Sequence, residues 1–96
     1  MREMRHHATQ AAALLKALAN ENRLLVLCTL AEGELSVGQL NQRVDLSQSA
    51  LSQHLAVLRR EGIVQTRRES QTIYYSLAST AAAGLIQYLY QTFCSQ

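Results

Sequence analysis

The stretch SVGQLNQRVDLSQSALSQHLAVLRR, residues 36–60, contains the pattern that decides the fold of this chain. Ser36 followed by Gln39 has the spacing of a capping box, which marks the start of a short helix. Its apolar side would consist of Val37, Leu40 and Val44. Ser47 is an N-cap candidate for a second helix, which Gly62 would end. The apolar face of this second helix would consist of Ala50, Leu51, Leu55 and Leu58.

Two short helices with a tight connection meet the physical requirement for a helix-turn-helix, in which the second helix reads the major groove of DNA. Glutamine can make paired hydrogen bonds to adenine, and small side chains let a helix approach the bases closely. Arginines near the end of the helix are expected to meet phosphate. The outward positions are Gln48, Ser49, Ser52, Gln53, Ala56, Arg59 and Arg60. A merely solvated helix face would show the same periodicity, so the helix alone does not distinguish the two interpretations.

Residues 63–77 favour the DNA-reading interpretation. They are rich in β-branched and aromatic residues and are interrupted by polar residues 68–71, which predicts a β-hairpin, the wing of a winged helix-turn-helix. Arg67 and Arg68 at its tip would contact phosphate, assisted by Gln71. Because Glu69-Ser70-Gln71 stands where a glycine is common, we expect a longer or looser turn, with Glu69 repelling phosphate.

The remaining segments predict three further helices. Residues 8–19 are rich in alanine and leucine at helical spacing, Asn20 can cap a second helix, and Ser79 or Thr80 can open the last one. The chain is therefore expected to be mainly α with a small β-hairpin, having five helices and the wing between helices four and five. We expect one domain over residues 1–96, with a mobile N-terminus that contains His6 and His7.

Charge is distributed unevenly along the 96 residues, although the net charge is only +2. Residues 43–68 carry five arginines against two acidic residues, whereas residues 70–96 contain no Asp, Glu, Lys or Arg. Something is expected to cover that uncharged segment. No segment reads as a membrane span or secretory signal, so we expect a cytoplasmic protein with reduced thiols and no cofactor.

Three segments, LSVGQL (35–40), LSQSALSQHL (46–55) and LRREGIV (58–64), together with ALANENRL (17–24), resemble the ArsR/SmtB family of repressors. The resemblance covers nearly the whole chain. It implies a winged-helix homodimer on double-stranded operator DNA, and places Ser47 and His54 on the DNA-binding helix with the outward residues above. It also implies that the first and last helices form the dimer interface. The residues expected there are Leu14, Leu15, Leu18, Leu85, Ile86, Leu89 and Phe93.

The chain departs from the family at both of its usual metal sites. Where many members have Cys-Val-Cys, this sequence has Ser36-Val37-Gly38, so the soft-metal site cannot form. Residues 79–96 contain no Asp, His or Glu to bind zinc across a dimer. We therefore expect no metal site, and interpret His54 as a packing or phosphate contact.

The two cysteines resemble those of the HlyU/BigR branch of the family, whose members respond to sulfide or redox state. That resemblance implies that Cys28 and Cys94 form the sensor pair, with reactive sulfur or an oxidant as inducer. The alternatives are that Cys28 is a small core residue and Cys94 an incidental thiol near a terminus.

Four other functions remain open on the sequence. One is a metal-responsive repressor that uses His6, His7 and a cysteine. Another is an anti-silencing activator of virulence genes, which the same branch contains. A thiol enzyme is disfavoured because no base, phosphate loop or catalytic carboxylate pair is recognisable, so we expect no enzyme. A protein-binding winged helix would show no salt-dependent affinity for duplex DNA.

Overall fold

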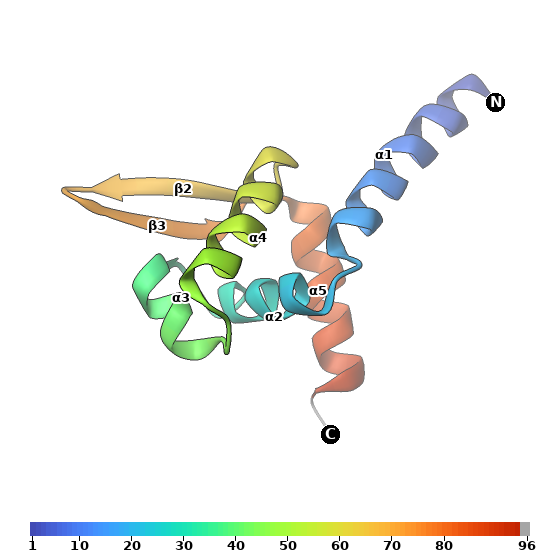
Figure 1. Ribbon diagram of the computed structural model, residues 1–96. Helices are drawn as coiled ribbons and strands as arrows, with labels where there is room; N and C mark the ends of the chain where they lie inside the picture. Colours follow the sequence, from blue (N-terminus) through green and yellow to red (C-terminus); the bar gives the residue numbers. More distant parts are fainter. Residues whose placement is uncertain (95–96) are drawn as a thin grey trace.

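The computed structural model describes residues 1–94 and confirms a mainly helical winged helix-turn-helix (Figure 1). Five helices and an antiparallel hairpin occur in the predicted order, and a two-residue strand, β1, adds to the hairpin. In chain order the elements are α1 (Arg2–Leu18), α2 (Glu21–Leu30), β1 (Leu35–Ser36), α3 (Val37–Arg43), α4 (Gln48–Arg60), β2 (Val64–Glu69), β3 (Thr72–Leu77) and α5 (Thr80–Phe93).

Helix α1 begins at Arg2, six residues before the predicted start. His6 and His7 therefore lie within a helix, and the expectation of a mobile segment there was wrong. The segment lacks glycine and proline, which allows the helix to continue beyond its apolar repeat. Only Ala17 and Leu18 of α1 are buried, because the N-terminal turns project away from the body (Figure 1).

The predicted N-caps all form. The Asn20 side chain accepts hydrogen bonds from the backbone N–H groups of Asn22 and Arg23, at 2.9 and 3.0 Å. Ser36 and Gln39 form both bonds of a capping box. The Ser47 and Ser79 hydroxyls accept the backbone N–H groups of Ala50 and Ala82, at 3.1 and 3.0 Å, and so cap α4 and α5. These bonds satisfy N–H groups that each helix leaves without an internal partner, so they fix where the helices start.

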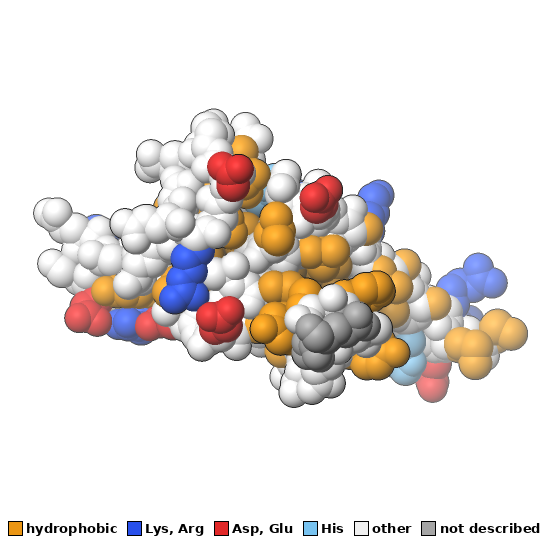
Figure 2. All heavy atoms as spheres, turned by 90° about the horizontal axis from the view of Figure 1, so that it is seen from below, with side chains coloured by type: hydrophobic (Ala, Val, Ile, Leu, Met, Phe, Trp, Pro, Cys, Tyr) orange, Lys and Arg blue, Asp and Glu red, His pale blue; other side chains and the backbone are white. Residues whose placement is uncertain are grey.

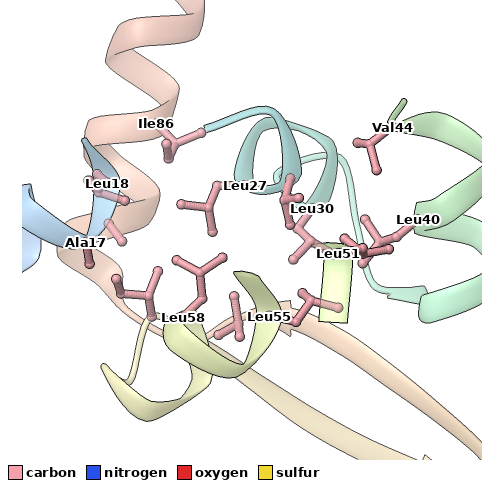
Figure 3. Packing of buried hydrophobic residues seen from close by; sticks show 14 residues of the cluster. Ala17, Leu18, Leu27, Leu30, Leu40, Val44, Leu51, Leu55, Leu58 and Ile86 are labelled. Atoms are coloured by element: carbon pink, nitrogen blue, oxygen red, sulfur yellow. The ribbon is translucent and has the colours of Figure 1, made fainter. Parts of the chain in front are cut away.

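The core is a single cluster between α2, α4 and α5 (Figure 3). Leu51, Leu55 and Leu58 of α4 point into it and are at most 1% exposed, while Leu27 and Ile86 face them from α2 and α5. Gly62 ends α4 with a φ of 74°, a left-handed conformation that glycine adopts without a Cβ penalty. The chain then enters the wing through buried Ile63.

The wing is a regular hairpin within a three-stranded sheet of order β1-β3-β2. Its last pair is Glu69 with Thr72, so only Ser70 and Gln71 form the turn. The expected longer or looser turn is therefore wrong. Ser70 takes the positive φ, at 59°, that glycine often supplies. As expected for neighbouring residues of a strand, Tyr75 packs on the core while Tyr74 faces the other side.

Candidate nucleic-acid interface and thiol pair

The turn between α3 and α4 is held from both sides. Leu40 and Val44 are buried, which anchors the end of α3 in the core. The Asn41 side chain donates a hydrogen bond of 2.8 Å to the Leu46 carbonyl, which ties the connection to α3. Together with the three buried leucines of α4, these contacts orient that helix with its polar face outward.

The outer face of α4 presents polar side chains to solvent. Within residues 1–94, no hydrogen bond is formed by the side chains of Gln48, Ser49, Ser52 or Gln53, and all four are exposed. Ser47 is exposed too, and its Oγ accepts the N–H of Ala50 as the helix cap. His54 is half-buried beside this row. The predicted base-reading residues therefore share one accessible surface on α4.

The two arginines at the end of α4 have different surroundings. Arg59 and Arg60 are both exposed. Arg60 lies 3.8 Å from Glu61 and lines a depression of about 340 Å³ together with Lys16 and Arg23. Arg23 also supports the fold, because its Nε donates a 2.6 Å bond to the Ala17 carbonyl. The positive charge predicted at this end of α4 is present, and the base of α1 adds to it.

The surroundings of the two wing arginines, Arg67 and Arg68, differ more than those of Arg59 and Arg60. The Arg67 guanidinium pairs with Glu34 at 2.7 Å and with Glu69 at 2.7 Å, and lies 4.6 Å from the centre of the Tyr74 ring. The hydrogen bond from Arg67 lowers the pKa of Glu34, and the two carboxylates raise the pKa of Arg67. Arg68 is exposed, and its Nε donates to the Ser70 carbonyl at 3.1 Å. Gln71 is exposed in the turn.

Glu34, which is 33 positions from Arg67 in the chain, was not predicted to take part in the site. The one signal in the sequence is the two-residue spacing between Glu34 and Ser36, which places both side chains on one face once the strand is known. Glu34 lies two residues before Ser36, which pairs with Tyr74, so both side chains belong on the sheet face of Tyr74. Without strand β1, which is too short to recognise in the sequence, that register could not be assigned.

The fold brings Cys28 and Cys94 to one groove, although they are far apart in the sequence. Cys28 lies half-buried on α2, and Cys94 is exposed at the end of α5. Burial raises the pKa of the Cys28 thiol, and the neighbouring Cys94 raises it further. The groove has a volume of about 480 Å³. Its other lining residues are Glu21, Leu24, Leu25, Leu89, Tyr90 and Phe93.

An apolar surface extends around the end of α5 and along α1 (Figure 2). Of the residues expected in a dimer interface, Leu15 is 55% and Phe93 74% exposed, and Leu14, Leu85 and Leu89 are half-buried. Leu18 and Ile86 are instead covered by the chain's own core. Tyr88 and Tyr90 contribute further exposed apolar area on α5.

Within residues 1–94, no group of three His, Cys, Asp or Glu side chains is arranged to hold a metal ion. His6 and His7 lie side by side on α1, with ring centres 6.1 Å apart. No helix in the same range is long and apolar enough to cross a membrane.

The sequence matches a family model described as bacterial regulatory protein, arsR family, over residues 20–66. The transcriptional activator HlyU of Vibrio cholerae is 53% identical over 94 residues, which cover 98% of this chain and 87% of that protein. The biofilm growth-associated repressor of Agrobacterium fabrum is 53% identical over 92 residues, which cover 96% of this chain and 79% of that protein.

Solved structures show the same likeness in three dimensions. The reduced HlyU of Vibrio cholerae superposes with a TM-score of 0.93 at 53% identity, over 99% of this chain and 100% of that one. A homodimeric winged helix-turn-helix DNA-binding domain from Mycobacterium bovis superposes with a TM-score of 0.83 at 30% identity, over 96% of this chain and 85% of that one.

Proposed function

Because the chain belongs to the arsR family of bacterial regulatory proteins and is a DNA-binding transcriptional regulator, we propose that it binds operator DNA as a homodimer under the control of Cys28 and Cys94. The observation that carries the proposal is the outer face of α4, where Gln48, Ser49, Ser52 and Gln53 are exposed with no internal partner among the described residues. Base edges are read by side chains of this kind. Ser47, His54, Arg59, Arg60, Arg68 and Gln71 complete the proposed DNA surface.

The dimer is proposed from the apolar surface on α1 and α5. Leu14, Leu15, Leu85, Leu89 and Phe93 would pack against a second copy, and the projecting turns of α1 would gain a partner. The Mycobacterium bovis neighbour is named as a homodimer, which agrees with this assembly. Two α4 helices would then enter successive major grooves about 34–36 Å apart.

Selection of binding sites from random duplex DNA tests this proposal. We expect reduced protein to enrich an imperfect palindrome with half-sites one helical turn apart, and sedimentation to give two chains per duplex. The expected affinity falls steeply with salt, because arginines displace counterions from phosphates. Recovery of no sequence preference would contradict the proposal, and so would one chain per duplex.

The thiol control is proposed as two balanced steps. The exposed Cys94 thiolate attacks the terminal sulfur of a persulfide RSSH, releases the thiolate RS⁻, and becomes a persulfide itself. The Cys28 thiolate then attacks the inner sulfur, forms the Cys28–Cys94 disulfide and releases hydrosulfide. With a peroxide ROOH, the Cys94 thiolate attacks the terminal oxygen, breaks the O–O bond, releases RO⁻ and becomes a sulfenic acid. The Cys28 thiolate then attacks that sulfur, forms the disulfide and releases hydroxide, which a proton converts to water. The groove that both residues line supports this pairing.

The rate of disulfide closure is expected to keep rising with pH. The attacking Cys28 must be a thiolate, and burial raises the pKa of its thiol above the ordinary value of about 8.5. Closure should therefore accelerate about tenfold per pH unit through the neutral range and should still be accelerating at pH 8.5. The reaction is followed by alkylating samples at intervals and measuring intact mass, with Cys28→Ser as the control that cannot close. A closure rate that stops rising below pH 8.5 would contradict the assignment of Cys28 as the attacking thiolate.

The relatives include a named activator and a named repressor, so the proposal covers control of transcription in either direction. A metal-responsive function is not favoured by any cluster of ligands in residues 1–94.

A further inference from the structure

The three strands of the wing sheet place Arg67, Tyr74 and Glu34 in a row across one face. Arg67 of β2 is paired with Tyr74 of the central strand β3, and Tyr74 is paired with Ser36 of β1. The Arg67 guanidinium crosses the Tyr74 ring and reaches Glu34, just before β1, with Nε and Nη2 at 3.0 and 2.7 Å from its two carboxylate oxygens. This two-pronged geometry fixes orientation as well as distance.

We infer that Arg67 is a positioning residue that holds the wing to the segment before β1, and that Arg68 is the arginine through which the wing contacts DNA phosphate. The inference rests on the proposed DNA binding and divides the roles of two residues that the sequence treats alike.

The charges around the two arginines support a positioning role for Arg67 and a DNA-contacting role for Arg68. Arg67 is compensated by two carboxylates, Glu34 and Glu69, so the cluster as a whole is negative and repels phosphate. Arg68 points to the opposite face of β2, because successive side chains of a strand alternate. No carboxylate within residues 1–94 pairs with Arg68, and the only hydrogen bond of its side chain there is from Nε to the Ser70 carbonyl. Its charge is therefore available to an approaching anion.

The segment that contains Glu34, to which Arg67 binds, is itself connected to the helix-turn-helix. Glu32, two residues before Glu34, pairs with Arg43 of α3 at 3.1 Å. The wing and α3 are thus both tied to residues 31–34, the connection that follows α2. Arg67 thereby holds the wing relative to the helices that approach DNA. Without it, Arg68 would still reach phosphate in the complex, but binding would also have to order the wing, which costs affinity without removing a phosphate contact.

These ion pairs are about half exposed, so they add little to global stability. We therefore expect Arg67→Gln, Glu34→Gln and Arg68→Gln all to fold, so that changes in their DNA binding can be measured without loss of the fold. Operator affinity is measured for each over a range of salt concentrations. Arg68→Gln should lower the steepness of the salt dependence by about 0.9 per lost phosphate contact, or roughly 1.8 for a dimer.

Arg67→Gln should weaken binding several-fold with the steepness unchanged. Glu34→Gln should also weaken binding, but by less, because it removes the same ion pair together with a carboxylate that repels phosphate. The double variant should be no worse than Arg67→Gln, because both changes remove one interaction. Hydrogen exchange of β2 and β3 in the free protein should increase in Arg67→Gln and Glu34→Gln but not in Arg68→Gln.

A loss of steepness in Arg67→Gln equal to that in Arg68→Gln would overturn the inference, as would unchanged exchange in both Arg67→Gln and Glu34→Gln. The proposed function fails separately, if the unmodified protein selects no operator. The exchange measurement needs no DNA and still judges the role of Arg67 in that event.

Discussion

Replacement of Gln48 by alanine should reduce affinity for the selected operator by about 30-fold or more, which is the largest functional effect we expect from one exposed residue. The N-terminal residues of a recognition helix contact base edges, and Gln48 is the first residue of α4. One paired hydrogen bond to a base contributes about 1–3 kcal/mol, and a dimer loses it twice. The loss should concentrate at one base pair of each half-site.

Gln65→Ala is the matched control, because Gln65 is an exposed glutamine on β2, outside both the proposed DNA surface and the proposed dimer interface. It should leave operator affinity unchanged. The measurement is a binding titration with the selected duplex and with duplexes changed at single positions. If Gln48→Ala weakens all duplexes equally, Gln48 does not read sequence, and the proposed role of the α4 face is wrong at that position.

Replacement of Leu55 by alanine should be the most destabilising of the changes considered. Leu55 is 1% exposed and lies in the core on the inner side of α4 (Figure 3). Removing a buried leucine side chain leaves a cavity and costs about 2–5 kcal/mol. Total stability of a domain is typically about 5–15 kcal/mol, so a large share of it would be lost.

Thermal unfolding at fixed protein concentration measures this effect, since dimerisation makes the midpoint depend on concentration. A domain of this size loses about 4–8 °C per kcal/mol, so a drop of at least 8 °C is expected. Ser52→Ala, on the outer side of the same helix, should change the midpoint little. A Leu55→Ala midpoint within 3 °C of the unmodified protein, on the order of a surface change, would contradict the packing described.

Local signals were sufficient to predict most of the fold. The caps at Asn20, Ser36, Ser47 and Ser79 depend on residues within three positions, and the apolar spacing of α4 depends on one helix face. Strand β1 was missed because its two residues are extended by pairing with β3, a partner remote in sequence. The early start of α1 was missed because its first turns carry no apolar repeat.

The candidate site also combines features that the sequence predicts with features that depend on tertiary structure. The polar face of α4 follows from helical periodicity, so it could be predicted from the sequence alone. The Arg67–Glu34 pair depends on the strand order of the sheet, and the groove shared by Cys28 and Cys94 depends on how α2 packs against α5. The periodicity of the sequence predicts neither the ion pair nor the shared groove. For the thiols, resemblance to a family suggested the pair before packing placed both residues in one groove.

The most direct test of the central claim is one titration of the selected operator, at fixed salt, with reduced protein, protein treated with an organic persulfide, and treated Cys28→Ser. We expect tight binding by the reduced protein, loss of binding after treatment, and retained binding by the treated variant, which cannot form the disulfide. Equal binding by all three samples would contradict thiol control, and absence of binding by the reduced protein would contradict operator recognition itself.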